Sequence, residues 1–461
     1  MINQAINHWR ALQPYRNERL RCKNYTYGRQ YLDYVSDNNV RMTEERYIRL
    51  QGNVPLKNNL IRRIVRNVLG VFRYNMKFPT PESLGLSESD PDDMWIARKL
   101  EESRLDENLK EVYARMMEEY LIGGMVAVRK RVRQSVGTLS GNRHGDLLVH
   151  TDCVRPDSFF FNIDSSDPRG RDISAIGEIH SVPLALAVTT FCRTPDDADR
   201  IGAYADSTGA ETGEPTVRVV EYWRKEVRNY WLWHDRQDGR VYRSEERPGG
   251  EAADCVWQSE LVWRYYFLAP DGTVLREGDS PYGEAGHPYV MRAYPFIDGE
   301  IHSFVADCID QQRYINRLIT LNDWILRSSA KGVLLFPEGS LPDNVRADDV
   351  ADQWARFNGV ITYRPQEGVP APHQVSHNST GIGISELLSV QLKMMEDVSG
   401  VNSALRGQLS SGAVSGTLYE LQTRQALTGL ADIIEGFENF MRDSALKEVA
   451  LLREQLRRLK S

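Results

Sequence analysis

Apolar residues recur every three to four positions through most of the first 123 residues, and this spacing predicts amphipathic helices. The pattern is clearest from Lys57 to Arg73, where one helical face is apolar and arginines lie on its flanks. The residues of that face are Leu60, Ile61, Ile64, Val65, Val68 and Leu69. We expect one or two helices over residues 2–35, one over 57–73 and a long one over 92–123.

The middle of the chain has a different pattern, because short runs rich in Val, Tyr, Phe and Trp replace the helical spacing. Such runs predict β-strands. The expected strands are residues 125–132, 147–149, 158–163, 176–180, 217–225, 230–234 and 262–268. Asp-Gly pairs at 238–239 and 271–272 favour hairpin turns, since both residues tolerate positive φ. The predicted fold class is therefore α+β with an antiparallel body, in which residues 194–215 form a helix followed by a loop.

The last third of the chain returns to helical spacing. The expected helices are residues 299–331, 384–398 and 417–460. Gly429 and Gly436 lie inside the last of these and favour a bend. Residues 333–377 contain short apolar runs separated by prolines and a helical stretch at 348–357, which is typical of a small α/β insertion. The segment 406–416 is too polar to pack as core.

Composition places the chain among ordinary globular proteins. It has 461 residues, of which 41% are hydrophobic and 26% are charged. No apolar stretch approaches the roughly 18 residues of a membrane span, and the charged N-terminal 20 residues lack the apolar core of a secretory signal. We therefore expect no contact with a membrane and a chain that stays in a cytoplasm.

Positive charge is concentrated at the N-terminal end. Residues 1–80 contain 15 Lys and Arg against 5 Asp and Glu, a net charge of +10, although the whole chain carries −7. A basic segment on an acidic chain indicates contact with a nucleic acid or an acidic protein. A solvated basic helix face has the same composition, and both interpretations stay open.

Recognised catalytic signatures are missing from the sequence. It contains no GxxxxGK[ST] phosphate loop, GxSxG elbow, HExxH helix or EF-hand pattern, and its nine histidines are scattered. The cysteines are Cys22, Cys153, Cys192, Cys255 and Cys308. They never form CxxC, so we expect small buried thiols in place of disulfides or zinc ligands. The sequence predicts no enzyme, no cofactor and no metal site.

Four stretches of the chain resemble sequences of one known protein family. They are VRVVEYWRKE at 217–226, HPYVMRAYPFIDGEIHSFV at 287–305, DCIDQQRYINRL at 307–318, and the pair EDVSGVNSALRG and SGAVSGTLYELQTRQ between 396 and 425. None is a catalytic motif. Their order, and the order of strand-rich body, long helix, insertion, second helix, polar loop and last helix, resemble the portal protein family of tailed bacteriophages (Caudovirales). The resemblance covers nearly the whole chain.

The resemblance implies a portal fold with wing, stem, clip and crown regions. Its regions are a wing of N-terminal helices and antiparallel β body at 1–300, a first stem helix at 301–331, a small α/β clip at 332–378, a second stem helix at 379–400, a tunnel loop at 401–416 and a helical C-terminus returning to the wing at 417–461. Any crown is expected to be small or absent.

The same resemblance implies the function. Portal proteins form a ring, a dodecamer in virions, at one capsid vertex through which double-stranded viral DNA is packaged, retained and ejected. The implied partners are further copies of the chain, the DNA, the large terminase, head-completion or adaptor proteins, and the major capsid or scaffolding protein. Assembly in the host cytoplasm and a head-to-tail connector role in the virion are part of this expectation.

The tunnel loop supplies the expected DNA-channel residues. They are Asn402, Arg406, Gln408, Ser410, Ser411 and Ser415. Arg406 is the only charged residue between 401 and 416. Weak contacts suit a channel, because every phosphate neutralised adds affinity that would hold a moving duplex. The alternative is an ordinary exposed connection in which Arg406 pairs with a neighbouring acid.

Polar residues interrupt the apolar face of the first stem helix. They are Gln311, Gln312, Asn316 and Asn322. A buried amide is costly without hydrogen-bond partners, and neighbouring subunits of a cyclic oligomer would provide them. We expect a stem subunit interface here, although side chains that point to water would leave the same pattern.

The clip carries the expected docking surface for the packaging motor and, later, for head-completion proteins. Its residues are Glu338, Asp343, Arg346, Asp348 and Asp349. This assignment comes from the resemblance, because a charge cluster is also what any solvated face shows.

Two other functions fit parts of the sequence. A metal-dependent nuclease suits the basic N-terminal segment, with Asp307 and Asp310 one helical turn apart on a possible metal-binding face. A head-tail adaptor or another structural virion protein suits the absence of catalytic motifs. Metal-dependent DNA cleavage that is lost on changing Asp307 or Asp310 would identify a nuclease. A closed ring with a central channel would distinguish a portal from an adaptor or another structural virion protein.

Overall fold

The computed structural model divides the chain into two compact units. It describes residues 1–134, 147–192, 194–206, 214–234, 240–247, 254–283, 286–331, 333–337, 339–355, 360–365, 367–375, 383–401 and 428–460. Unit 1 consists of Met1–Lys23, Val65–Ala306 and Ser403–Ser461, and unit 2 of Asn24–Ile64 and Asp307–Asn402.

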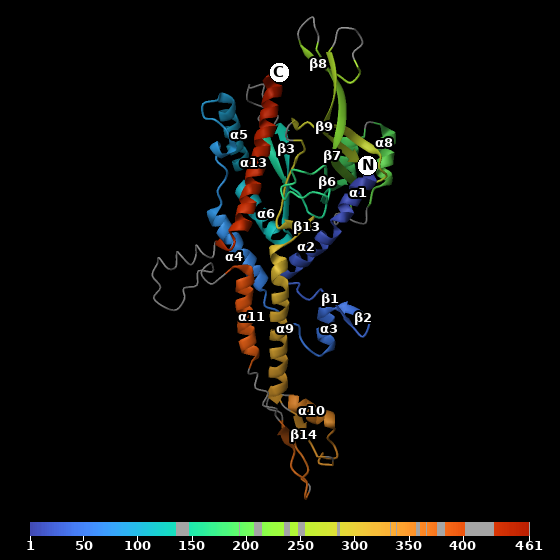
Figure 1. Ribbon diagram of the computed structural model, residues 1–461. Coiled ribbons are helices and arrows are strands. Elements are labelled where there is room, and N and C mark those ends of the chain that lie inside the picture. Colours follow the sequence, from blue (N-terminus) through green and yellow to red (C-terminus); the bar gives the residue numbers. More distant parts are fainter. Residues whose placement is uncertain are drawn as a thin grey trace, which may run out of the picture. The chain divides into compact units, whose positions relative to one another are not determined.

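Helices of unit 1 come from both ends of the chain (Figure 1). They are α1 (Ile2–Ala11), α5 (Pro91–Asp106), α6 (Leu109–Gly123), α7 (Leu184–Phe191), α8 (Pro195–Ala203) and α13 (Ala431–Lys460), with a short 3-10 helix η1 (Glu82–Leu84). Three further helices begin in one unit and end in the other: α2 (Gln13–Thr26), α4 (Leu60–Asn75) and α9 (Phe304–Lys331).

The strands of unit 1 form two main sheets. They are β3 (Met125–Gln134), β4 (Leu147–Cys153), β5 (Phe159–Phe161), β6 (Ala175–Pro183), β7 (Thr216–His234), β8 (Val241–Ser244), β9 (Asp254–Leu268), β10 (Val274–Asp279) and β11 (Tyr289–Ala293), with a small pair β12 (Phe296–Ile297) and β13 (Glu300–Ile301). One sheet has the order β10-β9-β7-β6-β5, with β8 beside β7, and the other β11-β3-β4. Every described pairing is antiparallel, which confirms the predicted α+β class and the antiparallel body.

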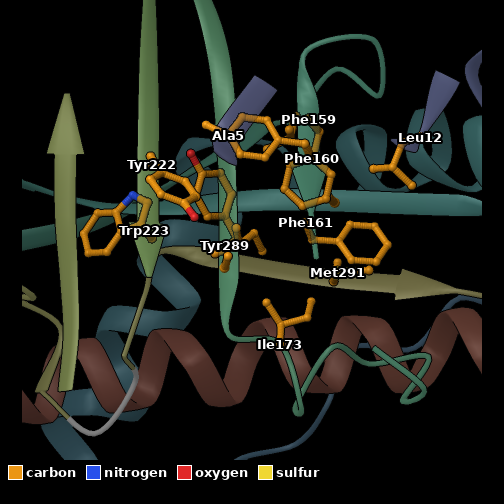
Figure 2. Packing of buried hydrophobic residues seen from close by; sticks show 14 of the residues in the cluster. Ala5, Leu12, Phe159, Phe160, Phe161, Ile173, Tyr222, Trp223, Tyr289 and Met291 are labelled. Atoms are coloured by element: carbon orange, nitrogen blue, oxygen red, sulfur yellow. The ribbon is translucent and has the colours of Figure 1, made fainter. Parts of the chain in front are cut away.

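The main core of unit 1 joins the two sheets. Phe159, Phe160 and Phe161 of β5 are fully buried, and Tyr222 of β7 and Met291 of β11 belong to the same cluster. Figure 2 shows these side chains gathered with Ala5 of α1 and Leu12, which lies between α1 and α2. The N-terminal helices therefore cover part of the sheet core with one apolar face.

A second core attaches α13 to unit 1. Val449 and Leu452 of α13 pack with Leu100 of α5 and Val149 of β4. Gly436 lies in α13 where its backbone approaches Tyr120 of α6, since a Cβ there would be 2.9 Å from the Tyr120 hydroxyl. The close approach of the two helices explains why a residue without a side chain occupies this position.

Unit 2 contains smaller elements. They are β1 (Tyr34–Asp37), β2 (Val40–Thr43), α3 (Glu44–Leu50), β14 (Val333–Leu335), α10 (Ala347–Ala355), β15 (His373–Val375) and α11 (Ile384–Ser399). β1 pairs with β2, and β14 with β15. The predicted α/β insertion between two long helices is confirmed, because β14, α10 and β15 lie between α9 and α11 in the chain.

The prediction of one helix over residues 92–123 is wrong. The chain forms α5 and α6 instead, and Asn108 between them has φ of 48°. Asparagine tolerates this left-handed conformation, which ends a helical run. Leu105, in the last turn of α5, is 75% exposed.

The strand predictions also need correction. The two strands expected at 217–225 and 230–234 are one strand, β7, which pairs with β9 without interruption from Val220 to His234. The predicted turn at 271–272 is confirmed by Gly272, with φ of 92° between β9 and β10. Among the cysteines, Cys22 and Cys308 are buried as expected, but Cys153 is exposed.

Candidate functional site

Two buried amides connect α9 to the start of α4 in unit 2. Gln312 is fully buried, and its Oε1 accepts hydrogen bonds from the backbone N–H groups of Leu60 at 2.9 Å and Ile61 at 3.3 Å. Its Nε2 donates to the carbonyl of Asn58 at 2.7 Å. The first N–H groups of a helix have no partner inside that helix. Gln312 therefore acts as a cap for α4, supplied by a distant helix.

Asn316, one turn further along α9, extends this network. Its Oδ1 accepts from the backbone N–H of Asn58 at 3.2 Å and from Gln312 Nε2 at 3.0 Å, and its Nδ2 donates to Gln30 Oε1 at 2.7 Å. A fully satisfied buried amide network fixes one arrangement of its elements. The segment before α4 is thus held against α9 by the side-chain amides of Gln312 and Asn316.

The four residues predicted for a stem subunit interface have different surroundings. Gln312 and Asn316 already have partners within the chain. Gln311 and Asn322 are partly exposed on α9, and within the described residues Gln311 Oε1 has no hydrogen-bond partner. A role of these residues between subunits stays a prediction.

Apolar side chains are exposed along one stripe of α11. Leu387, Val390, Met394 and Val398 recur at spacings of three and four, and each is 44% to 48% exposed. Tyr314, Leu321 and Trp324 of α9 are also exposed. The apolar spacing that predicted this helix included Leu387 and Val398 but not Val390 or Met394, and a sequence does not show which apolar face the folded chain leaves uncovered.

The insertion between α9 and α11 carries both charged and apolar surface. Asp343, Arg346, Asp348 and Asp349 are exposed, as a docking surface requires, whereas Glu338 lies outside the described residues. Asp343 Oδ2 pairs with Arg364 Nη2 at 2.9 Å, and the hydrogen bond and charge of this guanidinium lower the pKa of the carboxyl.

An apolar groove lies beside these charges. It has a volume of about 390 Å³ and is lined by residues that include Leu334, Phe336, Val350 and Trp354. The apolar runs that predicted short strands supply part of it. Sequence patterns alone did not identify the groove, because its walls come from β14 and α10, which meet only in the folded chain.

The expected DNA-channel residues Asn402, Arg406, Gln408, Ser410, Ser411 and Ser415 all lie outside the described residues. Among the basic N-terminal residues, Arg63, Arg66 and Arg73 are exposed on α4. Their position fits a solvated face and a contact with a polyanion equally well.

Comparison with known protein families shows to which family the chain belongs. The family described as phage P22-like portal protein matches residues 6–456. The chain is a member of the P22-like phage portal protein family. No curated protein matches it.

Membership of the portal family confirms the resemblance drawn from the sequence. It gives the chain a phage portal role, connected with DNA packaging and with a vertex of the capsid, in a family that is structural and not enzymatic. In the described ranges, no three His, Cys, Asp or Glu side chains are grouped so that they could hold a metal ion. None of the described helices is long and apolar enough to cross a membrane.

Proposed function

We propose that this portal protein forms a ring-shaped homo-oligomer, a dodecamer in the virion, whose central channel passes double-stranded DNA. The match to the portal family over residues 6–456 carries the proposal. Genome packaging, retention and ejection at one capsid vertex, and assembly in the host cytoplasm, follow from this role.

The exposed apolar stripes of α9 and α11 support a ring. A stripe such as Leu387, Val390 and Met394 is unfavourable in water, because each apolar side chain left uncovered forfeits its burial energy. Repetition of one heterologous contact around a closed axis would cover the stripe on every copy. In this proposal, α9 and α11 are the stem helices, and Gln311 and Asn322 lie close to the contact between subunits.

The segment 401–416 is proposed as the loop that faces DNA. Arg406 is its only charged residue, and a ring would present one such arginine from every subunit. A collar of single positive charges attracts DNA but hinders its movement little, because few phosphates are neutralised at any moment.

The clip is proposed as the docking surface for the large terminase and later for head-completion or adaptor proteins. Asp343, Arg346, Asp348 and Asp349 provide charged groups at its surface, and the groove at Leu334 and Trp354 provides an apolar anchor site. This combination of an apolar centre and a polar rim is common in protein interfaces.

Ring formation is testable with the full-length chain by mass photometry and negative-stain electron microscopy. We expect closed rings with a central channel for the native protein. Val390→Asp should give monomers with an unchanged circular dichroism spectrum, whereas Ser389→Asp, on the opposite side of α11, should leave the rings intact. A native protein that stays monomeric at every concentration would overturn the proposal.

A further inference from the structure

Unit 1 contains a groove between helix α8 and strand β10. It has a volume of about 420 Å³. The residues that α8 contributes recur at spacings of three and four, which is the spacing of one helical face. They are Asp197, Arg200, Ile201 and Tyr204. Residues 273–277, which begin one position before β10, line the groove from the side of the sheet. One wall of the groove is thus a helix and the other is a strand.

Strand β10 is an edge of its sheet, because in the described part of the chain it pairs with β9 alone. Directly after β10, the N–H of Ser280 donates to the carbonyl of Trp263 in β9 at 2.9 Å. In an antiparallel ladder, bonded positions alternate with positions whose main-chain groups point away from the partner strand. Gly278 is therefore bonded to β9, and the main-chain groups of Glu277 and Asp279 point outward. These two residues offer N–H and C=O groups to a further strand.

The pairing register shows to which side each groove residue of β10 points, because directly paired residues lie on the same face of a sheet. Arg276 pairs with Phe267, which packs in one cluster with Ile201 of α8. Glu277 pairs with Tyr266, which belongs to the main core on the other face. Arg276 therefore points to the side of α8, and Glu277 points to the opposite side.

Two arginines on the α8 side of the groove have no protein partner. Arg200 and Arg276 are exposed, and neither forms a hydrogen bond or an ion pair with any residue that the structure describes. The carboxylates in the groove already accept hydrogen bonds. Asp197 belongs to the capping box of α8, and Asp271 accepts from the N–H of Thr273 at 2.9 Å and from its hydroxyl at 2.7 Å. Both guanidinium groups can therefore donate to carboxylates of another chain.

We propose that this groove accepts an extended segment of another protein, which adds to β10 as a further strand. The outward main-chain groups of Glu277 and Asp279 would pair with the backbone of the segment, as in other cases of strand addition. Side chains of the added strand alternate between the two faces, so every second one meets Arg200 and Arg276. The segment that fits is acidic on the α8 side and uncharged or basic on the other side, where it passes Glu277. The proposal does not depend on the ring or its channel.

Isothermal titration calorimetry of the full-length protein tests the charge of the groove. The probe is a capped peptide of alternating threonine and glutamate, which presents all its glutamates on one face when it is extended. We expect saturable binding by the native protein and binding about tenfold weaker by Arg200→Gln/Arg276→Gln, because charge-assisted hydrogen bonds are lost. A peptide of alternating threonine and glutamine is the control, and both proteins should bind it equally.

A proline in β10 tests the strand pairing. Glu277→Pro removes an N–H that β9 does not use, and proline is tolerated at such positions of edge strands. We expect this variant to keep the native circular dichroism spectrum and to lose peptide binding. Glu277→Gln is the matched control, since it keeps the N–H and should bind the peptide as the native protein does.

Modified peptides test the same pairing without changing the protein, so they remain valid if Glu277→Pro misfolds. The N–H groups of alternate residues in a strand point to the same edge. N-methylation of one residue type, either the threonines or the glutamates, should therefore abolish binding, whereas N-methylation of the other type should leave it unchanged.

The proposal is overturned if the native protein does not bind the peptide of threonine and glutamate, if Glu277→Pro folds and binds it as tightly as the native protein, or if the two N-methylated peptides behave alike. Absence of peptide binding together with loss of rings in Glu277→Pro, measured by mass photometry, would also overturn it and would assign the edge of β10 to a neighbouring copy of the chain.

Discussion

Lys130 lies on β3 with its side chain completely buried, and it depends on one carboxylate. Its Nζ donates to Glu448 Oε2 of α13 at 2.9 Å and to Thr151 Oγ1 of β4 at 2.8 Å. Burial is the largest single influence and lowers the pKa of Lys130, but the charge and hydrogen bond of Glu448 together with neighbouring acidic groups outweigh it, so the pKa is raised. The lysine is therefore charged inside unit 1 and ties α13 to the small sheet.

Removal of one partner of this pair should destabilise the protein strongly. In Lys130→Met, the carboxylate of Glu448 stays buried without its cation, and such a change costs about 3–5 kcal/mol. We expect a clearly lower urea midpoint for the first unfolding transition of the full-length chain, monitored by circular dichroism.

The double variant Lys130→Met/Glu448→Leu provides the control, because apolar replacement of both partners removes the unpaired charge. It should recover most of the lost stability. If the double variant unfolds as early as the single one, the loss arises from packing and not from the buried charge.

Sequence alone could place Lys130 in a strand but could not show this role. The polar residues of the strand at 125–132 are the consecutive Arg129, Lys130 and Arg131, and of these Arg131 faces water. The partner of Lys130 is 318 positions away. Only the tertiary structure brings such a pair together. Alternation patterns assign polar residues to the exposed face of a strand, so they do not identify a polar residue that points inward.

At the scale of elements, the start of α4 relies on a residue of α9. Gln312→Leu removes the side-chain acceptor for the N–H groups of Leu60 and Ile61, and it removes one donor to the Asn58 carbonyl, which still accepts from the Leu60 N–H at 2.9 Å. An unsatisfied buried group costs about 1–3 kcal/mol. We expect faster amide hydrogen exchange at residues 58–61, measured by mass spectrometry, and a lower thermal midpoint.

Gln311→Leu is the matched comparison for that change, since it makes the same substitution at the neighbouring position of α9. Gln311 Oε1 has no partner within the described residues, so its loss should cost little. Equal exchange rates at residues 58–61 in the two variants would show that Gln312 does not cap α4.

Other elements show where periodicity is sufficient and where it is not. The apolar stripe of α4 predicted its buried face correctly, because Ile61, Val65 and Val68 are almost inaccessible to solvent. The break at Asn108 was not predicted, since asparagine is compatible with both a helix and a positive φ. The polar residues in the middle of β7 suggested a gap between two strands. They are instead paired with β9 in an exposed part of the strand, where polar side chains are tolerated.

At the scale of the whole molecule, the order of elements carried more information than any motif. Helices, an antiparallel body, a long helix, a small insertion and further helices were predictable, and this order led to the portal family. Pairs of charged residues that meet only in the folded chain were not predictable. Lys130 and Glu448 are 318 positions apart, and no sequence spacing connects them.

The proposed channel makes its most specific prediction at Arg406. Each phosphate that a cation neutralises steepens the dependence of DNA affinity on salt. Arg406→Ala should leave ring assembly intact but make duplex binding by the rings less salt-dependent, and particles assembled with it should retain less DNA. Fluorescence anisotropy over a range of salt concentrations measures the first effect, and DNA content per particle the second.

Gln408→Ala changes the same loop without changing its charge, so it separates electrostatics from loop shape. Its salt dependence should equal that of the native ring. If both variants behave alike, the loop acts through its backbone and not through a collar of charge. If Arg406→Ala abolishes the ring, the arginine belongs to a contact between subunits, and the charge that meets DNA must come from another part of the chain, such as the basic first 80 residues.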